Sequence, residues 1–109
     1  MTPLETARAF MVALEGRDPD GAAALCATDV TIRLPGGDSE LEGRDAARKL
    51  VRMAPAFRRL IREELVEGST VILKGLTRAP GLFTNFTTWT FETDGEWITH
   101  LTFQWKPGN

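Results

Sequence analysis

The chain has 109 residues, of which 42% are hydrophobic and 26% charged, and its formal net charge is −2 at pH 7. This length and composition favour one globular domain over residues 1–109 and exclude a largely disordered chain. Acidic and basic residues nearly balance, so nothing in the composition favours nucleic acid or an anionic membrane as a partner.

The small number of cysteine and histidine residues also limits the possible disulfides and metal sites. Cys26 is the only cysteine and His100 the only histidine. No internal disulfide can form, and the N-terminal residues lack the apolar run of a signal peptide or membrane span, so we expect a cytoplasmic protein. One cysteine and one histidine do not make a typical zinc site, and we expect neither a metal nor a cofactor.

The N-terminal half is predicted to be mainly helical. Thr2-Pro3-Leu4-Glu5 has the capping-box pattern, and apolar residues then recur at helical spacing as far as Gly16. Asp18-Pro19 restarts the chain as a second, short helix. A third helix begins after Gly43 and ends at Pro55, because proline interrupts the helical hydrogen bonding.

The remaining segments are predicted to be strands. The alternating run Val30–Leu34 forms one early strand, which Pro35-Gly36-Gly37 ends. Phe57–Glu67 and Thr70–Arg78 are joined by a short turn, and Leu82–Trp105 folds as a further hairpin. The expected order is therefore three helices with one early strand, followed by a four-stranded antiparallel meander.

The last hairpin predicts where a functional face would lie. Asp94-Gly95 between two alternating runs favours a two-residue turn, which places Thr93 opposite Glu96. Counting outward pairs Trp89 with His100. The same face would carry Asn85, Thr87, Phe91, Ile98, Thr102 and Gln104. The opposite face would carry Thr84, Phe86, Thr88, Leu101, Phe103 and Trp105.

Several short motifs resemble a known family in their order and spacing. They are Ala13-Leu14-Glu15-Gly16-Arg17-Asp18-Pro19-Asp20-Gly21, Glu42-Gly43-Arg44-Asp45-Ala46-Ala47, Glu67-Gly68-Ser69-Thr70-Val71 and Thr93-Asp94-Gly95-Glu96-Trp97-Ile98. Together they resemble the NTF2-like superfamily, in its SnoaL-like and ketosteroid-isomerase branch. The resemblance implies an α+β, cystatin-like cone in which three N-terminal helices pack on a curved, mostly antiparallel sheet around a pocket.

The same resemblance argues against ketosteroid isomerisation. That chemistry needs a carboxylate base, with a tyrosine and a protonated aspartic acid to hold the enolate oxygen. Matching the motifs places the tyrosine position at Phe10, the base position at Leu34 and the second aspartate position at Thr87. Phenylalanine and leucine cannot donate or accept a proton, and the chain contains no tyrosine.

A pocket of mixed character remains as the expected site. Its ligand-binding residues are predicted to be Phe10, Leu34, Glu64, Phe83, Asn85, Thr87, Trp89, Thr102 and Gln104. His100 is the candidate acid–base residue, since a buried imidazole can transfer protons near neutral pH. The alternative is a half-buried histidine that is hydrogen-bonded by Thr102 or water, with Asn85, Thr87 and Gln104 bonded to one another.

Two classes of function follow from this inventory. The first is a SnoaL-like isomerase, cyclase, dehydratase or hydrolase that uses His100 on a small, apolar organic substrate. The second is a non-catalytic dimeric module that binds a ligand or a partner. The missing carboxylates favour the second class, and the usual activities of the resembled family favour the first.

The outer sheet face is expected to be covered. Phe86, Trp97, Leu101, Phe103 and Trp105 are predicted to lie on it, and exposing them would cost about 25 cal/mol per Å² of apolar surface. In the resembled family this face commonly packs on a second copy, so the resemblance implies a homodimer.

Overall fold

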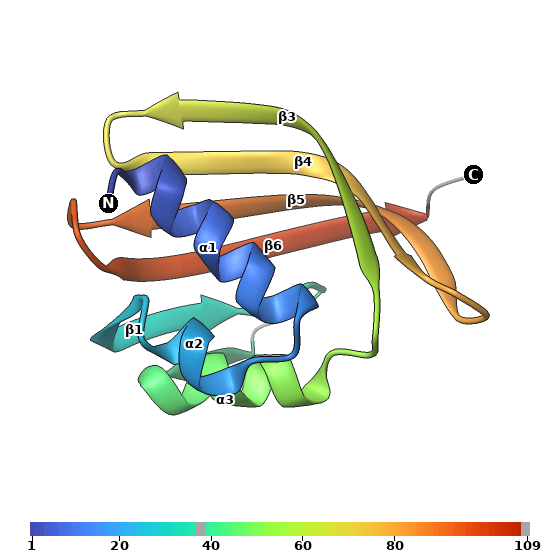
Figure 1. The fold of residues 1–109 in the computed structure, drawn as a ribbon, viewed down its shortest axis with the longest axis horizontal. Helices are drawn as coiled ribbons and strands as arrows, with labels where there is room; N and C mark the ends of the chain where they lie inside the picture. The colour runs from blue at the N-terminus through green and yellow to red at the C-terminus, as the bar shows by residue number, and fades with distance from the viewer. Residues whose placement is uncertain (37–38, 108–109) are drawn as a thin grey trace.

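The computed structural model describes residues 1–36 and 39–107. One six-stranded sheet, in the order β2-β1-β6-β5-β4-β3, curves around the helices (Figure 1). The helices are α1 (Pro3–Glu15), α2 (Pro19–Ala23) and α3 (Arg44–Met53). The strands are β1 (Cys26–Arg33), β2 (Glu40–Glu42), β3 (Arg58–Glu67), β4 (Thr70–Ala79), β5 (Phe83–Thr93) and β6 (Ile98–Pro107). The predicted α+β fold, with three helices on a curved and mostly antiparallel sheet, is confirmed.

The helices begin where the capping residues predict. The Thr2 hydroxyl accepts a hydrogen bond from the Glu5 backbone N–H at 3.1 Å, and the Glu5 carboxylate accepts one from the Thr2 N–H at 2.8 Å. The Asp18 carboxylate caps α2 by accepting from the Gly21 N–H at 3.0 Å. These side chains satisfy N–H groups that a helix leaves unpaired in its first turn.

Two features of the early sheet were not predicted. Strand β1 begins at Cys26, four residues before the predicted start at Val30, and it pairs parallel to β6. Strand β2 is a short polar segment that pairs antiparallel to β1. Its three residues are too few for the alternating apolar pattern that identifies a strand from sequence. Within the predicted break after Leu34, Gly37 lies outside the described residues.

The sheet bends where β3 lies close to Gly75 of the neighbouring strand β4. A Cβ atom at this position would lie 2.0 Å from the Leu60 carbonyl oxygen, so only glycine allows so close an approach. The pairing of β3 with β4 also shifts between Ile61 and Glu63, which marks a bulge. Bulges bend the strand that carries them, and β3 turns down toward α3 beyond this point (Figure 1).

The predicted pairing of the last hairpin is wrong. Thr93 pairs with Ile98, so the connection contains four residues rather than two. The Asp94 carboxylate closes this turn by accepting hydrogen bonds from the backbone N–H groups of Glu96 at 3.0 Å and Trp97 at 2.8 Å. Beyond the turn the pairing shifts again, and His100 lies opposite Glu92.

The second shift determines which side chains face the helices. The two extra residues in the turn shift the pairing of β6 with β5 by two positions from the predicted one. A shift of two leaves each side chain on its predicted face. Thr99 has no partner on β5 and shifts the pairing by one further position. This places every later side chain of β6 on the face opposite to the predicted one. Leu101, Phe103 and Trp105 therefore lie on the concave face, and His100, Thr102 and Gln104 lie on the convex face.

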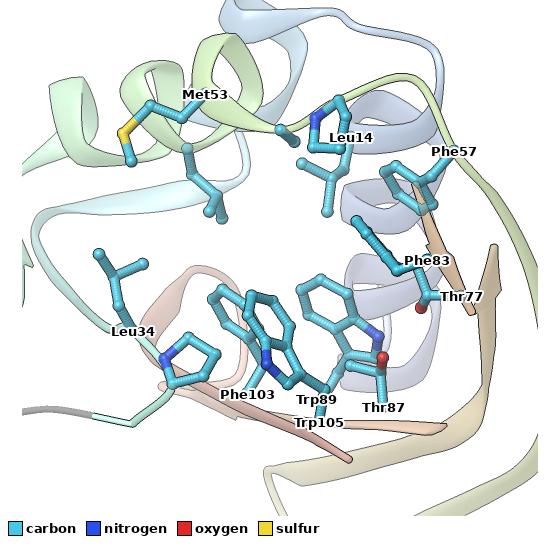
Figure 2. A pocket seen from close by; sticks show the side chains of 14 residues that line it. Leu14, Leu34, Met53, Phe57, Thr77, Phe83, Thr87, Trp89, Phe103 and Trp105 are labelled. Carbon is cyan, nitrogen blue, oxygen red and sulfur yellow. The ribbon is translucent and has the colours of Figure 1, made fainter. Parts of the chain in front are cut away.

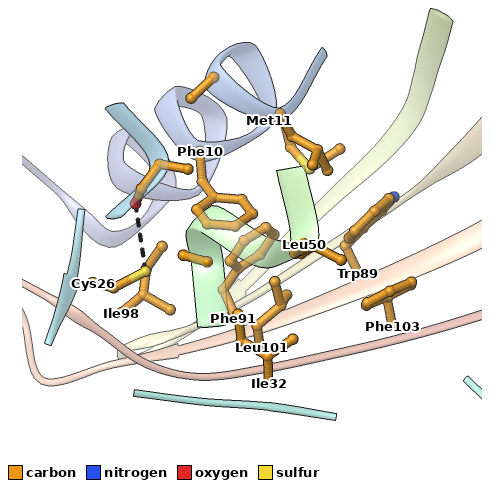
Figure 3. Packing of buried hydrophobic residues seen from close by; sticks show 14 of the residues in the cluster. Phe10, Met11, Cys26, Ile32, Leu50, Trp89, Phe91, Ile98, Leu101 and Phe103 are labelled. Carbon is orange, nitrogen blue, oxygen red and sulfur yellow. Dashed lines mark hydrogen bonds between the residues drawn. The ribbon is translucent and has the colours of Figure 1, made fainter. Parts of the chain in front are cut away.

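The concave face is filled at the end where β5 finishes, which we call the closed end. There Phe10 of α1 packs edge-to-face on Phe91 with ring centroids 5.7 Å apart (Figure 3). Cys26 is fully buried nearby, and burial raises the pKa of its thiol to about 12, which makes it an unreactive core residue. None of the helices in the described ranges is long and apolar enough to cross a membrane.

Candidate functional site

The other end of the concave face encloses an apolar pocket of about 330 Å³. Side chains from α1 and α3 face the aromatic rings of β5 and β6 across an open space (Figure 2). The pocket reaches solvent past Met53 and Trp105, which are each more than half exposed. Its lining consists of Leu14, Leu34, Pro35, Leu50, Met53, Ala54, Pro55, Phe57, Thr77, Phe83, Thr87, Trp89, Phe103 and Trp105.

Aromatic stacking forms the floor of the pocket. Trp89 and Phe103 pair directly across β5 and β6, and their rings stack with centroids 4.7 Å apart and planes inclined by 19°. Trp105 tilts against Phe103 at 5.8 Å and against Phe83 at 6.5 Å. This produces a broad apolar surface.

Two polar contacts hold the wall that connects α3 to β3. The Arg17 guanidinium donates from Nη1 to the Ala54 carbonyl oxygen at 2.6 Å. The Glu15 carboxylate accepts a hydrogen bond from the Arg59 backbone N–H at 2.9 Å. Both contacts join the end of α1 to the segment that carries Pro55 and Phe57, so this segment is fixed in place beside the cavity.

Thr87 supplies the most informative polar atom in the pocket. Its side chain is 2% exposed, and its hydroxyl oxygen has no hydrogen-bond partner among the described residues. Leaving a buried hydroxyl unpaired costs about 1–3 kcal/mol. Thr77 lines the same wall from the neighbouring strand and is also buried (Figure 2).

Among the residues that the structure describes, the lining contains no acid, base or thiol. The only polar side-chain groups among these residues are the hydroxyls of the two threonines and the indole N–H groups of Trp89 and Trp105, none of which titrates near neutral pH. The pocket surface is therefore mainly apolar, and the Thr87 hydroxyl is buried in its wall. None of the described side chains that line it can accept or release a proton as a general acid or base.

Four of the predicted binding residues lie in the pocket, and the predicted catalytic residue does not. Leu34, Phe83, Thr87 and Trp89 line the cavity. His100 is exposed on the convex face, where its Nδ1 lies 3.2 Å from the Thr99 hydroxyl oxygen. The expectation that His100 faces the cavity is wrong because the unpaired residue before it reverses the strand.

The other predicted binding residues are also displaced. Phe10 is fully buried at the closed end, and Glu64 forms an ion pair with Arg8 instead of facing the cavity. Asn85 is half-buried opposite Thr77 but is not part of the lining. Thr102 and Gln104 follow His100 onto the convex face, opposite Thr90 and Thr88 respectively.

The predicted convex apolar face needs a similar correction. Phe86 is on that face and is 38% exposed. Trp97 lies in the turn, 37% exposed, beneath the Arg44 guanidinium at 5.5 Å. Leu101 and Phe103 are core residues, and Trp105 lines the pocket.

Most of the lining that sequence reasoning missed comes from two places. Phe103 and Trp105 were assigned to the wrong face, yet the apolar spacing in β6 carries a signal of the reversal. Apolar residues occur at 98, 101, 103 and 105, so one interval is three residues long and the others are two. Met53, Ala54, Pro55 and Phe57 lie at the end of α3, where no periodic pattern indicates an orientation.

The part of the chain that the structure describes contains no cluster of three or more histidine, cysteine or acidic side chains able to hold a metal ion. The site is thus defined by its apolar walls and by the hydroxyl of Thr87.

Comparison with known proteins agrees with this architecture. Residues 7–104 match the SnoaL-like domain family. The chain belongs to this family. No curated protein matches the sequence. A solved protein from Sphaerobacter thermophilus has 31% identity to this SnoaL-like domain and a TM-score of 0.88, with 99% of both chains covered.

More distant solved structures share the fold. A putative ketosteroid isomerase from Kribbella flavida is 21% identical, with a TM-score of 0.84 over 96% of this chain and 78% of its own. An LEH-like epoxide hydrolase of M. tuberculosis is 21% identical, with a TM-score of 0.79 over 95% of this chain and 82% of its own. At this identity the likeness establishes the fold of the SnoaL-like domain and no activity.

Proposed function

We propose that this SnoaL-like domain binds a small, uncharged and largely apolar organic molecule in the concave pocket. The observation that carries the proposal is the buried Thr87 hydroxyl, which lacks a protein partner in an otherwise apolar wall. A ligand with one hydrogen-bonding group would satisfy that oxygen, and its apolar body would cover the rings of Trp89 and Phe103.

Binding without proton transfer by the protein is the better supported of the two classes of function. Within the described ranges the lining offers no general acid or base, and His100 lies on the opposite face of the sheet. Isomerases, cyclases, dehydratases and hydrolases that act by acid–base catalysis need such a group within hydrogen-bond reach of the substrate. A carrier or ligand-sensing role needs only the cavity.

The matched probes 2-naphthol and naphthalene test this proposal, because they share an apolar body and differ by one hydroxyl. Binding is followed by the fluorescence of Trp89 and Trp105, which line the pocket. We expect Thr87→Val to weaken 2-naphthol binding by about 5-fold, the value of one net hydrogen bond, and to leave naphthalene binding unchanged.

Thr90→Val is the matched control, since Thr90 lies on the convex face of the same strand. It should leave the binding of both probes unchanged. Failure of both probes to bind the unaltered protein, or equal weakening of both by Thr87→Val, would contradict the proposal.

A further inference from the structure

A second groove, of about 270 Å³, lies on the convex face of the sheet. Pairing across three strands places Arg58 of β3 opposite Arg78 of β4, and Arg78 opposite Thr84 of β5. Leu60 lies opposite Leu76 in the next row of the same face. The groove therefore has a polar row beside an apolar row. Its whole lining consists of Arg58, Arg59, Leu60, Leu76, Arg78 and Thr84.

The groove and the apolar pocket lie on opposite sides of the same strands. Arg78 and Thr84 line the groove, whereas their neighbours Thr77 and Phe83 line the pocket. Side chains of a strand alternate between its two faces, so the backbone of the sheet separates the two sites. What the groove binds is therefore independent of the ligand proposed for the pocket.

Two positive charges face each other in the groove. Residues directly opposite one another in an antiparallel pair have Cβ atoms about 5 Å apart, and like charges at that spacing destabilise a sheet. Arg58 and Arg78 are both exposed, and neither takes part in the ion pairs between described residues. The arrangement is unfavourable for the protein alone, and an anion held between the two guanidinium groups would reverse the sign of the interaction.

Among the described residues, no acid lies in the groove to balance these charges. The first acid on this face of β3 is Glu63, opposite Lys74, and Lys74 is four residues along β4 from Arg78. Four residues span about 13 Å of a strand. This exceeds the distance of about 8–10 Å over which exposed charges interact at physiological salt. Glu63 also has Lys74 as a nearer cation.

Arg59 borders the groove as well, but its charge already has a partner. Its backbone N–H donates to the Glu15 carboxylate at 2.9 Å, and its Nε lies 3.7 Å from the same carboxylate oxygen. It is paired with Thr77 across the sheet, which places it on the concave side. The charge left in the groove is therefore that of Arg58 and Arg78.

We propose that this groove binds a small organic phosphate, a phosphate monoester with a ring or a short chain as its apolar body. Arg58 and Arg78 can each donate paired hydrogen bonds to phosphate oxygens, and the Thr84 hydroxyl beside them can donate another. The apolar body then lies on Leu60, which is 56% exposed, and on Leu76.

A phosphate monoester matches the groove better than a carboxylate does. It carries a charge of about −1.5 to −2 at pH 7 and so balances both arginines, whereas a carboxylate balances one. The planar guanidinium group of arginine also fits phosphate oxygens two at a time. The leucines favour an organic phosphate over the free ion, because only the organic ligand covers their apolar surface.

Phenyl phosphate, inorganic phosphate and benzoate test this assignment, because they separate the charge of the head from the apolar body. Isothermal titration calorimetry of the unaltered protein at low salt should give a dissociation constant near or below about 1 mM for phenyl phosphate. Inorganic phosphate and benzoate should each bind at least about 5-fold more weakly, since the first has no apolar body and the second has a single charge.

Arg58→Gln combined with Arg78→Gln should weaken phenyl phosphate binding by at least about 10-fold, because it removes both charged donors. Without ligand, this variant should unfold at a temperature equal to or above that of the unaltered protein, since like charges no longer oppose each other. The matched control is Arg62→Gln with Lys74→Gln, which changes the net charge equally at exposed positions outside the groove. It should change phenyl phosphate binding by less than about 2-fold.

Four results would each overturn the proposal. They are no binding of phenyl phosphate to the unaltered protein, equal weakening by the arginine variant and the control, benzoate binding as tight as that of phenyl phosphate, and displacement of phenyl phosphate by naphthalene. The last would place the probe in the apolar pocket. A lowered unfolding temperature for the arginine variant would also overturn it, because the two arginines would then have partners within the protein. Circular dichroism checks that every variant is folded.

Discussion

The two faces of this sheet are built from alternate residues of the same strands, yet they have opposite properties. On the concave face Phe91, Leu101 and Phe103 are buried, whereas their neighbours Thr90 and Thr102 lie half-buried on the convex face. The composition of β6 alone does not determine which set is inside. The unpaired residue Thr99 determines it, because side chains alternate between the two faces and one extra residue exchanges them.

Deleting Thr99 should therefore have the largest effect of any change of one residue in β6. Without it the register would reverse and Leu101 and Phe103 would leave the core, or the turn would have to break. We expect a loss of more than about 5 kcal/mol in the free energy of unfolding, which is enough to unfold most domains. Circular dichroism and urea unfolding measure this loss.

Thr99→Ala is the control, because it retains the unpaired residue and removes the γ-methyl group and a hydroxyl that donates to the Glu92 carbonyl oxygen at 3.1 Å. It should remain folded. A stable deletion variant with an unchanged spectrum would show that the bulge does not set the two faces.

The concave face itself differs from end to end, since one end is filled and the other hollow. Phe10 is fully buried at the closed end, and Phe83 is half-buried beside the pocket. Phe10→Ala should lower the free energy of unfolding by about 3–5 kcal/mol, because it opens a new cavity. Phe83→Ala should cost less than half as much, because its ring already borders open space. Equal losses in urea unfolding would remove the distinction between the two ends.

Much of this fold could be predicted from local signals in the sequence. The capping box at Thr2, the proline at position 55 and the two-residue turn at Gly68-Ser69 all act through short-range geometry, and each indicated an element correctly. The reversal after Ile98 depends on an unpaired residue, which is a property of two strands together. Local turn chemistry therefore predicted the hairpin but not its faces.

Only part of the candidate site could be predicted, again because of the unpaired residue in the last hairpin. Thr87 and Trp89 precede the bulge in the hairpin and were assigned correctly to the concave face. Phe103 and Trp105 follow it and were assigned to the convex face. The wall around Pro55 depends on how the end of α3 meets the sheet, which is a tertiary contact that the local pattern does not encode.

The concave and convex faces can also be compared through the hydroxyl groups of Thr87 and Thr90. Its hydroxyl is buried without a partner, so Thr87→Val should raise the free energy of unfolding by about 1 kcal/mol while weakening the binding of 2-naphthol. Thr90→Val, on the opposite face, should change stability by less than about 0.5 kcal/mol. A destabilised Thr87→Val variant would indicate that the hydroxyl has a partner in solution, such as an ordered water.

The smallest expected effect concerns two adjacent acids on opposite faces of β3. Glu64 lies on the concave side and is held by both oxygens to the Arg8 guanidinium, whereas Glu63 lies on the convex side opposite Lys74. The hydrogen bonds from Arg8 lower the pKa of the Glu64 carboxyl below its ordinary value of 4.5. A carboxyl whose pKa falls on folding stabilises the fold above its unfolded pKa, and that contribution is lost as the pH falls through the folded pKa.

Glu64→Gln should accordingly lower stability slightly at pH 7 and should make the loss of stability between pH 5 and pH 3 less steep. The effect is modest because both side chains remain partly exposed and solvent screens the pair. Glu63→Gln is the matched control and should leave the slope of stability against pH nearly unchanged. Urea unfolding at a series of pH values measures both slopes. If the two variants gave the same slope, the ion pair between Arg8 and Glu64 would make no distinct contribution to stability. The contact between α1 and the concave side of β3 would then not depend on this pair.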